Sequence, residues 1–289
     1  MTMPEKDPER LEIIARYEAL EAKGIFDLDV EDDPPGRPIL PGTVDYKQQK
    51  LSTRVKAAWT FSLARKFLKK IVKNGTLIIK DVIGVENLDD LQTGAILTCN
   101  HFSPMDTFAM QVAYEKSTAS KKRKLFRVIR EGNYTSFPGF YGKLMRSCNT
   151  LPLSSNLATM KEFLEGVDYQ LKKGHLVLVY PEQSLWWNYR KPKPLKPGAF
   201  TFAAKAGVPV VPLFICMEDS NKIGPDGFPV QELTIFVEKP IFPDPKKTQF
   251  ANTKAMADAN YKCWKEVYED FYKIPLTYTC GDIEKAAKA

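Results

Sequence analysis

The chain has 289 residues and five cysteines, and its 42 lysines and arginines outnumber its 35 aspartates and glutamates, which gives a net charge of +7. This length can bury one full hydrophobic core, or one core with an appendage, and the cysteines have neither paired nor metal-ligand spacing, which excludes a disulfide scaffold and a cysteine-based metal site. No apolar run approaches the ~20 residues of a membrane-spanning helix, and no nucleic-acid-binding motif accompanies the positive charge.

The first 44 residues are acidic, with eleven acidic and five basic side chains and a net charge of −6. Residues 8–23 have a helical pattern. Residues 24–44 are rich in Asp, Pro and Gly, a composition that is typical of an irregular connection. We therefore expect one N-terminal helix followed by a long irregular segment.

Residues 45–80 reverse this charge, with ten basic side chains, one acidic side chain and a net charge of +9. Apolar residues recur there at every fourth position, which gives a broad apolar band on a helix: Leu51, Val55, Trp59, Leu63, Phe67 and Ile71. Basic residues crowd the second half: Arg65, Lys66, Lys69, Lys70 and Lys73. This pattern is typical of an anchor on anionic lipid. The alternative is a band that packs on the rest of the protein with solvated lysines, and the sequence leaves both open.

A histidine and an aspartate follow the second predicted strand. Strands are predicted near 76–86 and 94–99, and Ser103 then resembles a helix N-cap with proline at the first helical position. His101 lies in the turn, so its imidazole can fold back toward Asp106, which has the spacing of a capping box with Ser103. A histidine oriented by a carboxylate can take a proton from a weak nucleophile at neutral pH. The alternative is that Asp106 only caps the helix and His101 only packs.

A carboxylate holds the same position after a later strand. Between the two strands the pattern predicts further elements: helices near 106–116, 138–146 and 157–172, and strands near 124–130 and 150–153. The run at 175–180 is then a buried strand that Pro181 stops, and Glu182 follows at once. Open α/β sheets place their sites at the carboxyl ends of strands, so His101 and Glu182 can meet in one crevice.

The loop after Glu182 is rich in proline and in cations. Arginine and lysine bind phosphate, so this loop suits an anionic substrate; the alternative is a solvated basic loop. Its candidate residues are Ser184, Trp186, Trp187, Arg190, Lys191, Lys193 and Lys196.

The remaining pattern predicts strands near 209–216 and 232–238 and helices near 198–206 and 252–272. The alternation predicts an α/β fold with a mixed, largely buried β-sheet flanked by helices, and with an N-terminal helical appendage. We expect the appendage over residues 1–75 and the catalytic domain over residues 76–289.

Three motifs in this order resemble those of the glycerolphosphate and lysophospholipid acyltransferases, in particular the 1-acylglycerol-3-phosphate acyltransferase branch. They are Asn100-His101 to Asp106, then Tyr180-Pro181-Glu182-Gln183-Ser184, then Val210-Val211-Pro212-Leu213. The resemblance runs over roughly residues 76 to 240.

The resemblance implies transfer of a fatty acyl group from a thioester to a lipid hydroxyl in phospholipid synthesis. His101 would be the general base and Asp106 would orient it, while Glu182 would help hold the acceptor. The nearby cations Arg130, Arg190, Lys193 and Lys196, with Ser184, would bind the acceptor and its phosphate. No metal or cofactor is implied, since acyl-CoA or an acyl carrier protein thioester is a substrate, and the choice between these donors is left open.

The sequence departs from the family in one motif. Related sequences usually read Pro-Glu-Gly-Thr-Arg, whereas Gln183-Ser184-Leu185 stands here in the last three places, so the arginine assigned to phosphate is missing. The departure leaves the acceptor headgroup open. Hydrolysis of a lipid ester or thioester, and a non-catalytic peripheral membrane protein, are the alternative functions.

The predicted location is the cytoplasm, peripheral on the inner face of the membrane, where anionic lipid would be the partner surface. The cysteines are then free thiols in a reducing compartment. The basic run at 121–124 is typical of a solvated loop, with docking of an acidic acyl carrier protein as the alternative. No nucleic-acid partner is expected.

Overall fold

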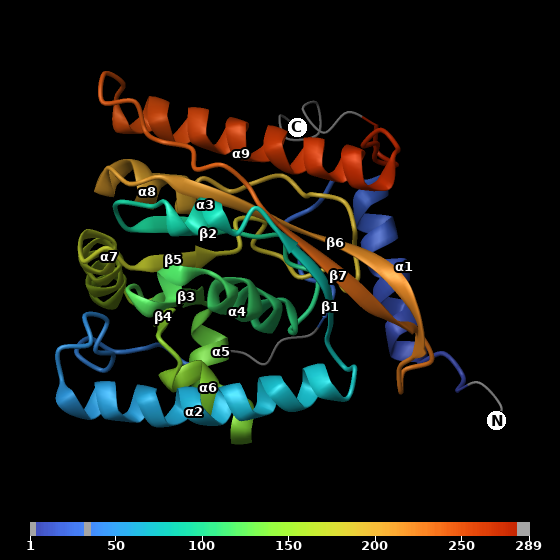
Figure 1. Ribbon diagram of the computed structural model, residues 1–289, viewed down its shortest axis with the longest axis horizontal. Helices are drawn as coiled ribbons and strands as arrows, with labels where there is room; N and C mark the ends of the chain where they lie inside the picture. The colour runs from blue at the N-terminus through green and yellow to red at the C-terminus, as the bar shows by residue number, and fades with distance from the viewer. Residues whose placement is uncertain (1–3, 32–35, 282–289) are drawn as a thin grey trace.

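A computed structural model describes residues 4–31 and 36–281, and a seven-stranded sheet runs through the middle of it (Figure 1). The strand order is β1-β7-β6-β2-β5-β3-β4; β6 and β7 are antiparallel, and the other neighbouring pairs are parallel. The strands are β1 Ile78–Ile83, β2 Ala95–Thr98, β3 Leu125–Ile129, β4 Thr150–Pro152, β5 Leu176–Val179, β6 Val210–Ile223 and β7 Pro229–Val237. The predicted mixed α/β sheet is confirmed.

Helices cover both faces of this sheet. They are α1 Pro8–Ala22, α2 Leu51–Lys73, α3 Glu86–Asp89, α4 Asp106–Lys116, the 3-10 helix η1 Thr118–Lys121, α5 Glu131–Thr135, α6 Gly139–Ser147, α7 Leu157–Lys172, α8 Gly198–Ala206 and α9 Gln249–Tyr272. The predicted positions of the long helices are confirmed. The short elements α3, η1 and α5 were not predicted, because one helical turn is too short to show a period.

Local signals set several of these helix ends. The side chain of Asn156 accepts hydrogen bonds from the backbone N–H groups of Ala158 and Thr159, and α7 begins there. Gly207 ends α8 in the left-handed conformation, with φ of 67°, which glycine adopts without steric cost. These ends direct the chain from each helix back into the next strand.

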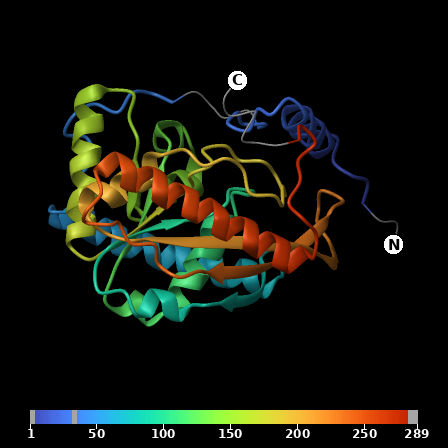
Figure 2. The same cartoon turned by 90° about the horizontal axis from the view of Figure 1, so that it is seen from above.

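Alternate residues of the central strands enter two different cores, one on each face of the sheet. Leu97 of β2 belongs to the core that α4 and α6 cover, together with Met110. Ile96 of the same strand belongs to the core beneath α7, α8 and α9, together with Phe163 and Phe200. Figure 2 shows α9 lying along the long strand β6. Both faces of the central strands are therefore buried.

The β6–β7 hairpin is longer than predicted. The sequence predicted strands at 209–216 and 232–238, whereas β6 continues to Ile223 and β7 begins at Pro229. Beyond Met217 the side chains of β6 are mostly polar and at least partly exposed, so this part lacks the apolar run that identifies a buried strand. Antiparallel pairing between the two strands maintains the extended conformation there.

Helix α2 packs with only part of its apolar band. Leu68 and Ile71 are buried in the core that includes α4 and α6, and α2 packs against α6 (Figure 1). By contrast, Leu51, Val55 and Trp59 keep 67%, 60% and 58% of their surface exposed. The band therefore packs on the rest of the protein in the second half of the helix, while its role as a lipid anchor stays a prediction for the exposed first half.

The N-terminal residues also pack on the rest of the chain. Ile13 of α1, Phe26 and Val30 form one cluster with Trp186 and Trp187. The domain boundary near residue 75 stays a prediction, because side chains from both sides of it share these cores. Within the described ranges, no helix combines the length and the apolar character needed to cross a bilayer.

Candidate active site

The two motifs meet at one edge of the sheet. Strands β2 and β5 are parallel neighbours, and Thr98 pairs with Val179 at their carboxyl ends. His101 and Glu182 follow these ends directly, and a Glu182 carboxylate oxygen accepts a hydrogen bond of 3.0 Å from the backbone N–H of His101. The prediction that the two motifs lie together is confirmed.

The imidazole of His101 contacts Asp106 as predicted, with 2.6 Å between Nδ1 and Oδ2. The Asp106 side chain is 1% exposed, and the same oxygen accepts from the backbone N–H groups of Phe102 at 3.3 Å and Ser103 at 3.4 Å. Asp106 is also the first residue of α4, where the helix dipole favours a negative charge. Since Nδ1 is engaged, Nε2 is the ring nitrogen that can accept a proton, and the side chain is 25% exposed.

The turn between the two residues differs in detail from the prediction. Helix α4 begins at Asp106 with Met105 at the N-cap, so Ser103 does not cap it. Instead, the Ser103 hydroxyl accepts from the backbone N–H of Met105 at 3.1 Å, within a turn that precedes the helix. The Ser103–Pro104 turn delays the helix by two residues, which lets the carboxylate of Asp106 reach back to the imidazole.

A neutral aromatic ring packs against the imidazole of His101. Its ring stacks on Tyr180, with 4.3 Å between ring centroids and 22° between the planes. Burial, reinforced by the charge of Asp106, raises the pKa of Tyr180 well above its usual value. Burial likewise raises the pKa of the Cys99 thiol, which has no exposed surface, so Cys99 is not a nucleophile.

Glu182 does not lie where a substrate can reach it, contrary to the expectation that it holds the acceptor. The residue is 2% exposed. One carboxylate oxygen accepts from the N–H of His101, and the other accepts from the N–H of Lys193 at 2.8 Å. Its contacts therefore fix the backbone beside the imidazole and leave the acceptor to other groups.

Lys193 and Ser184 are buried as well, which corrects their expected role in substrate binding. Lys193 is 1% exposed, and its ammonium nitrogen lies 3.4 Å from Glu182 Oε2. Ser184 has no exposed surface, and its hydroxyl donates to the carbonyl of Phe26 at 2.6 Å. Neither side chain is open to a phosphate in this structure.

The other three predicted cations lie at the surface, and each is paired with an acid. Arg130 donates to the carbonyl of Gln183 at 3.0 Å and forms an ion pair with Asp29. Arg190 lies 2.6 Å from Asp219, and Lys196 lies 2.8 Å from Asp27. Exposed pairs of this kind are weak, so an anionic ligand can compete for the cations. Their role in phosphate binding stays a prediction.

Two features of the site were missed at the level of sequence. The first is the segment 26–30, which lies on the loop after β5: Trp186 Nε1 donates to the Leu28 carbonyl at 2.7 Å, and the Leu185 N–H donates to Asp29 at 3.0 Å. These contacts join residues more than 150 positions apart, so no local pattern signals them. They bury the loop that follows Glu182.

The second missed feature is Asn100, which ties β6 to the turn that carries His101. Its amide donates to the carbonyl of Ile215 at 3.0 Å and accepts from the N–H of Ile215 at 2.8 Å. Asn100 is 2% exposed. The only local signal is its place immediately before the histidine.

We expect Asn100→Ala to lower the free energy of unfolding by about 2–5 kcal/mol, because it leaves a buried backbone N–H and C=O without partners. Chemical denaturation of both proteins measures this difference. Asn156→Ala, which removes a helix cap far along the chain, is the control and should cost about 1 kcal/mol. Equal stability of Asn100→Ala and the wild type would show that the two hydrogen bonds between Asn100 and Ile215 do not stabilise the fold.

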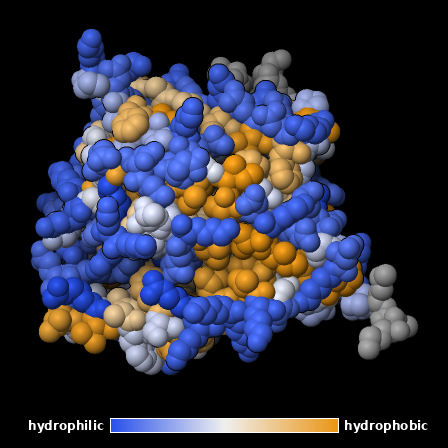
Figure 3. Space-filling model, viewed as in Figure 1, coloured by the Kyte–Doolittle hydropathy of each residue, from blue (hydrophilic) through white to orange (hydrophobic). Residues whose placement is uncertain are grey.

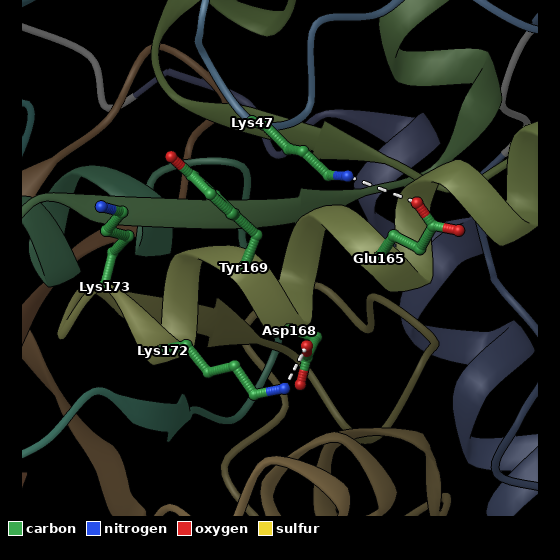
Figure 4. Close-up of a pocket in the computed structure, with 6 residues that line it drawn as sticks. All are labelled: Lys47, Glu165, Asp168, Tyr169, Lys172 and Lys173. Carbon is green, nitrogen blue, oxygen red and sulfur yellow. Dashed lines mark hydrogen bonds and ion pairs between the residues drawn. The ribbon is translucent and has the colours of Figure 1, made fainter.

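The open hollow on α7 is separate from this site. Lys47, Glu165, Asp168, Tyr169, Lys172 and Lys173 line it (Figure 4). Its charges pair with one another: Lys47 lies 3.3 Å from Glu165, and Lys172 lies 2.7 Å from Asp168. Over the residues that the structure describes, no group of three or more His, Cys, Asp or Glu side chains is arranged to hold a metal ion.

Comparison with known proteins finds similarity over the region that contains these motifs. The family model described as Acyltransferase matches residues 81–216, which include both halves of the site. The chain is 29% identical over 171 residues to a chloroplastic 1-acyl-sn-glycerol-3-phosphate acyltransferase of Brassica napus, and 32% identical over 152 residues to one of Arabidopsis thaliana. These matches cover 56% and 51% of this chain, but only 45% and 38% of the relatives. The chain thus spans less than half of each relative.

A solved structure is also similar in part. It is the crystal structure of the 1-acyl-sn-glycerophosphate acyltransferase PlsC from Thermotoga maritima, at 20% sequence identity and a TM-score of 0.49. The alignment covers 77% of this chain and 85% of that chain.

Proposed function

Since this chain belongs to the acyltransferase family, we propose that it transfers a fatty acyl group from a thioester to the free hydroxyl of a lysophospholipid or glycerolphosphate-type acceptor. The donor is an acyl-CoA or an acyl carrier protein thioester. The observation that carries this proposal is the contact between His101 and Asp106 at the partly exposed end of β2.

The geometry suits a single-step attack by the acceptor. His101 Nε2 takes the proton of the acceptor hydroxyl, and the alcohol oxygen attacks the thioester carbonyl carbon. The carbon–sulfur bond then breaks, and the thiolate leaves with the electron pair and takes up the proton held by the imidazolium. Asp106 holds Nδ1–H and stabilises the imidazolium, so a positioned base contributes about 10²- to 10⁴-fold without a covalent enzyme intermediate.

The surface of α2 supports a location on the membrane. Leu51, Val55 and Trp59 are exposed on its first half, and Arg65, Lys66 and Lys69 line a hollow on its second half. Figure 3 shows a further apolar patch in the middle of the face seen in Figure 1, above the lower edge along which α2 runs. An amphipathic basic helix binds anionic lipid because its apolar side chains enter the interface and its basic side chains are attracted to the lipid charge. We infer that the protein lies peripherally on the inner face of the membrane.

An acceptor panel tests the proposed reaction. Purified protein is mixed with radiolabelled acyl thioester, supplied both as acyl-CoA and as acyl carrier protein, and with lysolipids that differ only in headgroup. Labelled diacyl product with at least one acceptor supports the proposal, and its mobility names the headgroup. No labelled lipid with any acceptor, from protein that is folded by circular dichroism, would contradict it.

We expect replacement of Lys66, Lys69 and Lys70 by glutamine to weaken binding to vesicles that contain anionic lipid. Each lysine near the surface contributes about 1 kcal/mol, and the attraction is screened by salt. Vesicle co-sedimentation over a range of salt concentrations measures the effect. The control replaces three exposed lysines of α9, Lys254, Lys262 and Lys265. If both triple variants bind as the wild type does, or lose binding equally, α2 is not the binding surface.

A further inference from the structure

The loop 182–193 holds the backbone of His101 at both its N–H and its C=O group. Glu182 accepts from the His101 N–H at 3.0 Å, and the His101 carbonyl accepts from the Trp186 N–H at 3.4 Å. The ammonium group of Lys193 lies 3.5 Å from the same carbonyl and donates to the Ser184 carbonyl at 2.7 Å. These contacts join the loop to the backbone of His101, and none of them involves its imidazole.

Lys193 is an unusual member of this loop because its charge is inside the protein. Its side chain is 1% exposed, and its ammonium nitrogen lies 5.0 Å above the ring of Trp186, which has no exposed surface. A buried lysine is rare unless it is paired, and its partner here is the equally buried Glu182. The neighbouring Lys191, by comparison, pairs with Glu21 and is 27% exposed.

The charges near the imidazole come from several elements. Asp106 of α4 contacts the ring, Glu182 contacts the backbone N–H, and Lys193 contacts the backbone carbonyl. Burial lowers the pKa of Lys193, and the charges of Glu182 and of Asp29, from the segment that covers the loop, oppose that shift. The nearby side chains of Tyr180 and Cys99 are neutral, because burial raises the pKa of each. Two carboxylates thus flank His101, and one buried ammonium stands beside the second of them.

We propose that Lys193 is a positioning residue for His101, a buried cation that balances the charge of Glu182 while Glu182 holds the histidine turn. In this arrangement Asp106 remains the carboxylate that contacts the imidazole itself. The proposal relies on the proposed function only for the role of His101 as the base. The positioning contacts themselves stand on the distances and burial given above.

Removing the charge of Lys193 and removing that of Glu182 should shift the pKa of His101 in opposite directions. Lys193→Met removes a positive charge, which leaves Glu182 to favour the imidazolium and raises the pKa of His101. Glu182→Gln leaves the ammonium alone, which disfavours the imidazolium and lowers that pKa. The double variant restores the wild-type net charge, so the pKa of His101 should return toward the wild-type value. Nearby charges shift a pKa in these directions.

Titration of the histidine resonances by NMR tests the proposal without an activity assay. The chain has only two histidines, and His175→Gln assigns the His101 signal. We expect a shift of the midpoint by at least about half a pH unit upward in Lys193→Met and downward in Glu182→Gln, with a return in the double variant. Lys191→Met is the matched control, since it removes an equal charge from the same loop, and it should shift the midpoint by less than half as much.

Shifts of the same sign in both single variants, or no shift in either, would overturn the proposal. If Lys193→Met does not fold, Glu182→Gln and the double variant decide, because a downward shift must still be reversed by the second substitution. Acyl transfer measured in parallel separates the two inferences. Correct NMR shifts without transfer by the wild type would refute the function alone, and transfer with unmoved midpoints would refute the positioning role alone.

Discussion

Replacing His101 with alanine is expected to lower the rate of acyl transfer by about 10³-fold or more, while the protein stays folded. The acceptor alcohol is a poor nucleophile at neutral pH, and the variant has no group at Nε2 to take its proton. The imidazole contacts Asp106 and Tyr180 at the rim of the site, so its removal disturbs little of the core. Initial rates with saturating acyl thioester and acceptor measure the loss.

The control for this variant is the other histidine. His175 accepts a hydrogen bond from the backbone N–H of Lys124 at the opposite, amino-terminal end of β5, so His175→Gln should stay within about twofold of the wild-type rate. A loss below tenfold in His101→Ala would remove His101 from the mechanism.

Asp106→Asn is expected to reduce kcat by about 10²- to 10⁴-fold with little change in KM. The amide has nearly the shape of the carboxylate, but it carries no charge to stabilise the imidazolium. Its NH₂ group can also donate to Nδ1, which favours the tautomer with the proton on Nε2. Asp106 is 1% exposed and contacts no surface that a substrate reaches, so the ground-state complex should form normally. Steady-state kinetics over a range of acceptor concentrations separates the two parameters.

Asp89→Asn is the matched control for this substitution, because Asp89, at the end of α3, likewise accepts hydrogen bonds near a helix start, from the Ser117 hydroxyl and the Thr118 N–H of η1. It should cost stability and leave kcat unchanged. An equal fall in kcat in both variants would mean that Asp106 acts through folding alone. A rise in KM confined to Asp106→Asn would instead place Asp106 in acceptor binding.

The sequence predicted the sheet and the central pair because both depend on local patterns. Helices α4, α7 and α8 have the predicted limits, although Met105 rather than Ser103 stands at the N-cap of α4. The contact between His101 and Asp106 follows from one short turn, where the Ser103–Pro104 pair fixes the chain direction. Nothing distant is needed to place these two side chains together.

The roles of the loop residues could not be read in the same way. Lysines 193 and 196 look alike in a proline-rich stretch, yet Lys193 is buried against Glu182 and Lys196 is exposed beside Asp27. The difference arises from the segment 26–30, which covers the loop from more than 150 residues away. Burial by such a distant segment produces no periodic pattern in the local sequence. For this reason the buried Lys193 was predicted to be among the cations that can contact a substrate.

The fate of the acyl group in H₂¹⁸O tests the central claim most directly. The wild-type protein is supplied with acyl thioester and a lysolipid in this solvent, and all acyl products are identified by mass spectrometry. Attack by the acceptor hydroxyl predicts diacyl lipid that contains no ¹⁸O and that is lost in His101→Ala. Recovery of the acyl group mainly as ¹⁸O-labelled free fatty acid would contradict the account, because water rather than the lipid would then be the nucleophile.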